Sequence, residues 1–275
     1  MSRDLLGLEG RVAVVTGGGQ GGGRGIAMQL ARAGVHVAVA DLRQASAEAV
    51  AEELRGLGVH SIGLAADARE PSQIDSMVAR TERELGPLHV LVNNVGNYGQ
   101  FAPTPAVEVD WAFWQAAIDQ NLRTTFLCSQ AAALAMRATG EGGAIVNIAS
   151  LAGLRGSPLM APYGAVKAGV MQLTQTLALE LAPDRIRVNC VAPTGIEGPS
   201  LVDGMSEEAI DRMRKSIPLG ELASPEAVGD CVLMLASQLA RFVTGQTVMC
   251  DGGAHATTQR AGVVAGEGAR PAIGD

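Results

Sequence analysis

The chain has 275 residues, of which 47 % are apolar and 18 % are charged, a composition that indicates a globular protein with a sizeable core rather than a disordered chain. Its 21 basic and 28 acidic side chains leave a formal net charge of −7, which argues against nucleic acid or an anionic membrane as a partner. No apolar stretch approaches the roughly 20 residues of a membrane span, and the charged N-terminal segment does not resemble a secretory signal. We therefore expect a cytoplasmic protein without a membrane segment.

The cysteines and histidines form no recognisable metal-binding motif. The cysteines lie far apart with no CxxC spacing, and each falls in an expected strand or helix, so we expect free thiols, buried in a protein of a reducing compartment. The histidines are equally scattered and no HExxH pattern occurs, so no metal site is expected. The residues concerned are Cys128, Cys190, Cys231 and Cys250, and His36, His60, His89 and His255.

Short apolar runs alternate with longer segments of helical period along the whole chain. In the first half, the expected strands cover 11–16, 35–40, 59–65 and 88–94, and the expected helices cover 23–34, 44–55 and 71–85. In the second half, the expected strands cover 143–150, 186–193 and 245–250, and the expected helices cover 107–136, 161–182, 207–215 and 225–237.

Buried β-branched strands separated by helices are typical of a parallel sheet that is covered on both faces. The pattern therefore predicts an α/β fold, a doubly wound (Rossmann) seven-stranded parallel sheet with right-handed crossovers. No linker interrupts the alternation, so we expect a single domain over residues 1–253. The tail 254–275 has no clear period, and it is expected to be either a disordered end or an arm onto a neighbouring subunit.

The first expected strand leads into a glycine-rich segment, TGGGQGGGRGIA, at residues 16–27. Gly17, Gly21 and Gly23 have the spacing TGxxxGxG between a strand and a helix. A helix N-terminus presents unpaired N–H groups and a positive dipole end, and glycines let a pyrophosphate approach them closely. The segment predicts a phosphate cradle for a dinucleotide, the alternative being a tight turn without a ligand.

Asp41 follows the second expected strand, about 20 residues beyond the glycine segment. A carboxylate there can accept hydrogen bonds from the adenosine ribose and would repel a 2′-phosphate, which favours NAD(H) over NADP(H). Arg43 is the counter-evidence, because a guanidinium could hold that phosphate. Gln20 supplies no positive charge in the loop, so we expect NAD as the cofactor.

Tyr163 and Lys167 are four residues apart on one expected helix and therefore share a face. Ser150 ends the preceding strand, and Asn121 lies in the long helical region before it. Because the carboxyl ends of parallel strands meet at one edge of the sheet, these residues are expected to face a common crevice.

Together these motifs resemble those of the short-chain dehydrogenase/reductase superfamily. The resemblance covers residues 8–253, and it rests on a fixed order of motifs: TGxxxGxG at 16–23, Asp67, NNVG at 93–96, Asn121, Ser150, YxxxK at 163–167 and the turn at Pro193.

The resemblance implies roles for the four residues of the crevice. Tyr163 would be the general acid/base, with a pKa lowered by the Lys167 ammonium and the positive nicotinamide ring. Lys167 would also bind the nicotinamide ribose, and Ser150 would orient the substrate oxygen. Asn121 would hold a water molecule through its backbone, as part of a proton relay.

The resemblance also implies a set of cofactor contacts, and two residues depart from the family pattern. Thr194 stands in the usual Pro-Gly turn, and Gly198 stands where the family often has a threonine, which removes a hydroxyl contact to the cofactor. The implied cofactor-binding residues are Gly17, Gln20, Gly21, Gly22, Gly23, Asp41, Leu42, Asp67, Ala68, Asn94, Val95, Gly96, Tyr163, Lys167, Pro193 and Ile196.

The variable segment 194–220 is expected to form a lid over the substrate. Apolar, methionine-containing walls favour a hydrophobic, alicyclic secondary alcohol or its ketone, although each side chain could equally serve ordinary packing. The expected lid residues are Ile196, Leu201, Val202, Met205, Ile210 and Met213, and those of the facing wall are Tyr98, Phe101, Leu151, Leu154 and Met160.

Three functions follow from these expectations. The first is an NAD-dependent alcohol dehydrogenase or ketone reductase, and the alternatives are a 3-oxoacyl-carrier-protein reductase and a cofactor-binding regulator without catalysis. No basic run that would dock an acidic carrier protein is evident. The family resemblance also implies a homo-oligomer, a tetramer, that is built on the helices 107–136 and 161–182.

Overall fold

The computed structural model describes residues 4–96, 103–198, 201 and 206–257. Strands and helices alternate along the first half as predicted, with boundaries within two residues of the predicted ones. The elements are β1 (Val12–Thr16), α1 (Gly21–Arg32), β2 (His36–Asp41), α2 (Gln44–Arg55), β3 (Ser61–Ala65), α3 (Pro71–Leu85) and β4 (Leu88–Asn93).

The second half continues the alternation and adds short 3₁₀ turns around the sheet edge. Its elements are α4 (Trp111–Ala117), a π-helical turn (Ile118–Arg123), α5 (Thr124–Thr139), β5 (Gly143–Ile148), α6 (Ala161–Leu181), β6 (Ile186–Pro193), α8 (Glu207–Lys215), α9 (Pro225–Ala236) and β7 (Thr247–Cys250). The 3₁₀ turns are Ala106–Glu108, Leu151–Gly153, Ala182–Asp184, Gln238–Ala240 and Ala254–Ala256.

The prediction of one helix over 107–136 was wrong in two respects. The helix begins at Trp111, because the Asp110 carboxylate accepts a hydrogen bond from the Phe113 N–H at 2.7 Å and caps it. The helix then widens into the π-helical turn around Asn121 before α5 begins. A single π turn inside an α-helix is rare and is frequently found at functional sites.

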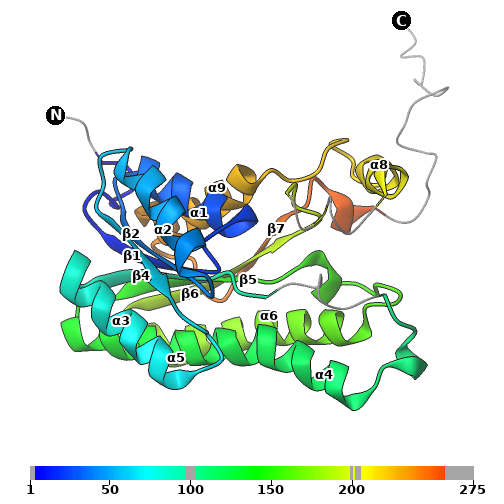
Figure 1. Cartoon of the computed structure of the whole chain (residues 1–275), viewed down its shortest axis with the longest axis horizontal. Coiled ribbons are helices and arrows are strands. Elements are labelled where there is room, and N and C mark those ends of the chain that lie inside the picture. Colours follow the sequence, from blue (N-terminus) through cyan, green and yellow to red (C-terminus); the bar gives the residue numbers. More distant parts are fainter. Residues whose placement is uncertain (1–3, 97–102, 199–200, 202–205, 258–275) are drawn as a thin grey trace, which may run out of the picture.

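The seven strands form one parallel sheet in the order β3-β2-β1-β4-β5-β6-β7, which confirms the predicted doubly wound fold. Alternate residues of β1 point to opposite faces, with Ala13 and Val15 on one side and Val14 on the other. Helices α1, α2 and α9 cover the first face, and α3, α5 and α6 cover the second (Figure 1). No helix of the described ranges is long and apolar enough to cross a membrane.

The order of the strands reverses between β1 and β4, because the chain first builds outward from β1 to β3 and then returns to place β4 on the other side of β1. In open α/β sheets, ligands bind beyond the carboxyl ends of the strands at such a switch point. The loops after β1, β4, β5 and β6 all leave the sheet at this edge.

Candidate active site at the carboxyl edge of the sheet

The loop between β1 and α1 is rich in glycine, so backbone atoms rather than side chains form its outer surface. Gly17 has a φ of +63°, which favours glycine, and it turns the chain out of the strand. A Cβ on Gly23 would lie 2.1 Å from the Gly17 carbonyl oxygen, so only glycine allows α1 to start this close to the loop. A Cβ on Gly21 would meet no atom within 4 Å, which leaves open space over the helix N-terminus.

Asn94 and Thr16 fasten this loop to the end of β4. The Asn94 side-chain amide donates to the carbonyl oxygens of Thr16 and Gly17, at 3.1 and 3.0 Å. The Thr16 hydroxyl accepts from the Asn94 N–H at 3.1 Å and donates to the Val92 carbonyl at 3.2 Å. The sequence analysis did not assign Thr16 a structural role in the site, although this threonine directly precedes the first motif glycine.

Asp41 lies at the end of β2 directly against the glycine loop. One of its carboxylate oxygens accepts from the Gly19 N–H at 3.1 Å, and the other accepts from the Arg43 N–H at 3.1 Å. The Arg43 guanidinium donates to the Gln20 side-chain oxygen at 2.8 Å. Both polar residues that bear on the choice between NAD and NADP therefore meet at the loop, with Leu42 exposed between them.

Asp67 lies after β3, where its carboxylate is engaged by Arg69. Two charge-assisted hydrogen bonds join them, at 2.6 and 2.9 Å, and they hold the pKa of the Asp67 carboxyl below its usual value. Ala68 is buried beside it. The expected binding of the cofactor by Asp67 stays a prediction, for a carboxylate that already has a partner.

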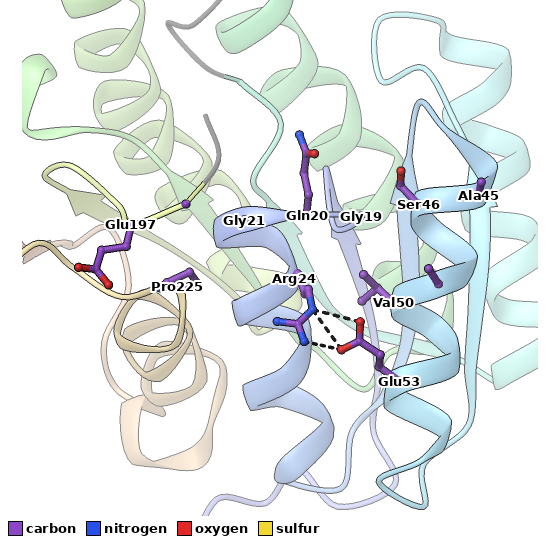
Figure 2. A pocket seen from close by; sticks show the side chains of 12 residues that line it. Gly19, Gln20, Gly21, Arg24, Ala45, Ser46, Val50, Glu53, Glu197 and Pro225 are labelled. Carbon is purple, nitrogen blue, oxygen red and sulfur yellow. Dashed lines mark hydrogen bonds and ion pairs between the residues drawn. The ribbon is translucent and has the colours of Figure 1, made fainter. Parts of the chain in front are cut away.

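A cavity of about 570 Å³ opens beside the glycine loop. Figure 2 shows loop residues Gly19 and Gly21 between α2 and the segment of Glu197 and Pro225. Arg24, one turn into α1, reaches across to Glu53 of α2 at 2.5 Å. Ser150, Tyr163 and Lys167 are not among the residues that line this cavity, so it adjoins the phosphate cradle rather than the reacting groups.

Tyr163 and Lys167 lie together on α6, as predicted. The Lys167 Nζ is 5.6 Å from the centroid of the Tyr163 ring, and it donates to the Ile148 carbonyl oxygen at 3.0 Å. Ser150, two residues beyond that carbonyl, hydrogen-bonds Tyr163, and its hydroxyl oxygen also accepts from the Ala152 N–H at 3.2 Å. The three side chains thus share the carboxyl edge at the end of β5.

Among the protein's own groups, burial outweighs the expected lowering of the Tyr163 pKa. Burial raises the pKa of the Tyr163 phenol above its ordinary value, and the hydrogen bond with Ser150 lowers it by less. Burial also lowers the pKa of Lys167 to about 8, since the residue is only 2 % exposed. Burial therefore destabilises the charged form of Lys167 at neutral pH, and an anionic or polar partner beside the amino group would stabilise it.

Asn121 projects from the π-helical turn toward the same edge. Its side-chain amide donates to the Ala117 carbonyl at 3.0 Å, but its buried Oδ1 has no hydrogen-bond partner within the described residues. A Cβ on Gly96 would lie 2.4 Å from this oxygen and 3.3 Å from the Lys167 Nζ. Gly96, with a φ of +130°, thus keeps the space between the two side chains open.

The expectation that the Asn121 backbone holds a relay water stays a prediction. Its carbonyl oxygen accepts from the Thr125 hydroxyl at 2.8 Å and lies 3.1 Å from the Thr124 hydroxyl, which can donate to the Gln120 carbonyl at 3.0 Å instead. Beside this carbonyl, the side-chain Oδ1 offers an acceptor that has no partner within the described residues.

The segment after Pro193 connects the sheet to the lid. Ile196 pairs with Ala223 as a short parallel bridge, and a Cβ on Gly22 would approach the Ile196 side chain to 3.4 Å. The expected lid and wall residues Leu201, Ile210 and Met213 pack with Leu151 in one apolar cluster, together with Ile217, Leu222 and Ala254. Leu154 is exposed and Met160 is partly buried, whereas Tyr98, Phe101, Val202 and Met205 lie outside the described residues.

The remaining expectations concern the tail, the cysteines and metal ligands. The first residues of the tail form the 3₁₀ turn Ala254–Ala256, which the Arg155 guanidinium holds through the Ala254 carbonyl at 2.7 Å; residues 258–275 lie outside the described residues. All four cysteines are free, Cys128 and Cys190 fully buried and Cys231 and Cys250 half-buried. No group of three or more potential metal ligands occurs within the described ranges.

Comparison with known proteins places this geometry in a family. A family model described as enoyl-(acyl carrier protein) reductase matches residues 17–255. The chain is 38 % identical to 3-oxoacyl-[acyl-carrier-protein] reductase FabG of Staphylococcus aureus over 245 residues, which are 88 % of this chain and 97 % of the relative. It is 35 % identical to the short-chain dehydrogenase/reductase eriH of Hericium erinaceus, over 88 % of this chain and 96 % of the relative.

Two solved structures are similar over nearly their whole length. A 7α-hydroxysteroid dehydrogenase in complex with NADH and 7-oxo glycochenodeoxycholic acid superposes with a TM-score of 0.86 and 31 % identity, covering 92 % of this chain and 97 % of that one. A short-chain type dehydrogenase/reductase from Mycobacterium marinum superposes with a TM-score of 0.84 and 33 % identity, covering 91 % and 98 %.

Proposed function

Because the chain belongs to the short-chain dehydrogenase/reductase superfamily, a family of oxidoreductases, we propose that it interconverts a hydrophobic, alicyclic secondary alcohol and its ketone with NAD(H) as the cofactor. The observation that carries the proposal is the placement of Tyr163, Lys167 and Ser150 at the carboxyl edge of the sheet, where the glycine loop also lies. An acid/base group, a cation and a hydrogen-bonding hydroxyl are thereby combined with a phosphate cradle.

The residues at this edge fit a nicotinamide dinucleotide. The open space over Gly21 and the close contact at Gly23 make a cradle that a Cβ at either of these two positions would disturb. We propose that further residues bind this dinucleotide beside Asp41 and Asp67, namely Gly17, Gln20, Gly22, Leu42, Ala68, Asn94, Val95, Pro193 and Ile196. When bound, the cofactor supplies or accepts the hydride.

The chain's own residues then manage the proton and the substrate oxygen. Ser150 donates to that oxygen and orients it. Tyr163 gives its phenolic proton to the oxygen in reduction and takes it back in oxidation. Lys167 stabilises the phenolate through its charge, and Asn121 holds a water molecule that exchanges protons with Lys167.

The preference for NAD(H) follows from the position of Asp41. Its carboxylate already accepts the hydrogen bond that the Gly19 N–H could otherwise donate to a 2′-phosphate. Arg43 is turned to Gln20, a neutral partner. The structural relative solved with NADH is consistent with this preference.

The hydrophobic substrate is supported by the apolar cluster that joins Leu151 to the lid helix α8. The solved relative in complex with a 7-oxo bile acid fits an alicyclic ketone. A specific observation also favours a second candidate, a 3-oxoacyl-carrier-protein reductase, since the FabG relative is 38 % identical. Against it, two of the three cations in the last turn of α8, Arg214 and Lys215, are paired with the carboxylates of Glu197 and Asp211, which offset the positive charge that an acidic carrier would meet.

We also propose that the protein acts in the cytoplasm as a homotetramer, with one catalytic domain over 1–253 that includes the lid 194–220. The four free thiols support a reducing compartment. Exposed apolar side chains on the helices expected at the interface support assembly, namely Trp111, Phe126, Leu134 and Leu179. Light scattering tests the assembly, and a monomer contradicts it.

The deciding experiment is an absorbance screen of nicotinamide reduction and oxidation. Alicyclic, steroidal and acyl-thioester ketones and the matching alcohols are offered with both cofactors. Turnover of alicyclic substrates with NAD(H) supports the proposal, and turnover of 3-oxoacyl thioesters alone selects the second candidate. If the protein binds the cofactor but turns over nothing in the panel, it is a cofactor-binding regulator.

A further inference from the structure

Two half-buried cysteines lie next to each other behind the lid, where the mechanism uses neither. Cys231 is in the middle of α9 and Cys250 ends β7, and their thiols are within hydrogen-bond reach of each other. The Cys250 Sγ also lies 3.7 Å from the carbonyl oxygen of Ala227, one helical turn before Cys231. Both sulfur atoms pack against the same apolar cluster.

We propose that Cys231 and Cys250 form a redox-sensitive thiol pair, which peroxide converts to an intramolecular disulfide that weakens dinucleotide binding. The other two cysteines cannot take this part, because Cys128 and Cys190 are 1 % and 0 % exposed. The effect on the dinucleotide rests on the proposed function, whereas formation of the disulfide does not.

The reaction needs only hydrogen peroxide as the oxidant. The Cys231 thiolate attacks one peroxide oxygen, the O–O bond breaks, and a sulfenic acid and one molecule of water result. The Cys250 sulfur then attacks the sulfenic sulfur, the S–S bond forms, and a second molecule of water leaves. The two sulfur atoms lose two electrons and the peroxide gains them. The hydrogen bond from Cys250 lowers the pKa of the Cys231 thiol to about 7, which makes Cys231 the first to react.

The pair is connected to the cradle through two packed contacts. The Cys250 carbonyl oxygen accepts from the Thr194 N–H at 3.3 Å, where the lid segment leaves the sheet. Helices α9 and α1 are in close contact at Gly25 of α1, since a Cβ on this residue would lie 2.5 Å from Pro225 of α9. A disulfide holds the sulfur atoms at about 2 Å and restricts the angle between the two Cα–Cβ bonds, so we expect its formation to shift α9 against β7 and with them these two contacts.

The sequence allows a direct test on the full-length protein. Trypsin cleavage after every lysine and arginine puts each cysteine on its own peptide: 124–137, 188–212, 216–241 and 242–260. After peroxide treatment and alkylation, we expect 216–241 to be joined to 242–260, with a mass lower by two hydrogen atoms and full reversal by dithiothreitol. Before oxidation, iodoacetamide at neutral pH should label 216–241 ahead of 242–260.

Cofactor affinity is the second measurement, by fluorescence titration with NADH before and after peroxide. We expect the Kd to rise about fivefold, the factor that one lost hydrogen bond corresponds to. Cys231→Ser and Cys231→Ala should abolish both the cross-link and the change in Kd, whereas the control Cys128→Ala should keep both.

Several results would overturn the proposal. The proposal is wrong if peroxide leaves the cysteines of peptides 216–241 and 242–260 reduced, if it converts them separately to sulfinic acids, or if it cross-links two chains. A cross-link with an unchanged Kd overturns the coupling to the cradle. Failure of the reduced protein to bind NADH refutes the proposed function instead, and the peptide masses still decide the disulfide.

Discussion

Replacing Asp41 by asparagine removes the carboxylate charge at the glycine loop and keeps its shape and one acceptor oxygen. The Asp41 Oδ2 takes the Gly19 N–H at 3.1 Å, so a phosphate oxygen that accepts from the same N–H would lie within about 5 Å of the carboxylate. We expect the substitution to raise the affinity for NADPH relative to NADH, because it removes a like-charge repulsion at this short distance.

The size of the effect follows from Coulomb's law. At about 5 Å, a pair of unit charges repels by about 1 kcal/mol in water and by about 3 kcal/mol at a protein surface of low polarity. A phosphate of about two charges therefore gives at least about 2 kcal/mol, or about 30-fold in relative affinity. Asp41→Ala should shift the ratio further, because it also leaves the N–H groups of Gly19 and Arg43 free to bind phosphate.

Fluorescence titration with NADH and NADPH at fixed ionic strength measures the ratio of the two Kd values. Added salt should shrink the effect, since it screens exposed charges. The control is Asp67→Asn, which alters a carboxylate on the neighbouring strand end and should change both Kd values in parallel. The reasoning is refuted if the unaltered protein already binds NADPH more tightly, or if Asp41→Asn leaves the ratio unchanged.

Three further changes test other parts of the site. Tyr163→Phe should lower kcat by about 10²- to 10⁴-fold with little change in NADH affinity, because it removes only the acid/base proton. Steady-state rates measure kcat and parallel titrations measure the affinity, and an unchanged kcat contradicts the role of Tyr163. Lys167→Met should stabilise the ligand-free protein below pH 8, since a pKa of about 8 in the fold against 10.5 unfolded costs about 3 kcal/mol there. This cost falls as pH rises from 8 to 10.5, so urea unfolding at pH 7 and 9.5 should show a shrinking difference, and a constant one contradicts the assignment. Gly23→Ala should abolish NADH binding because its Cβ would lie 2.1 Å from a backbone oxygen, whereas Gly22→Ala, with 3.4 Å to a side chain, should bind nearly as before.

Most of the fold was predictable from local patterns. Apolar runs of four to eight residues predict the seven strands, and the helical period between them requires crossovers that make the sheet parallel. The boundaries of β6 and α8 agree with the prediction to the residue, because Pro193 and Ser206 are strong end signals. The helix around Asn121 was predicted less well, since a single π turn is set by its backbone hydrogen bonds and leaves the hydrophobic periodicity almost unchanged.

The sequence by itself determined which residues gather at the sheet edge, because the alternation of strands with helices and the four-residue spacing of Tyr163 and Lys167 are local properties. Only the tertiary structure decided their electrostatics. Burial raises the pKa of Tyr163, lowers that of Lys167 and leaves the Asn121 Oδ1 without a partner, and all three depend on atoms that arrive from distant segments. The nearness of Cys231 and Cys250 is likewise a product of packing, since desolvation and contact are sums over neighbours in space rather than along the chain.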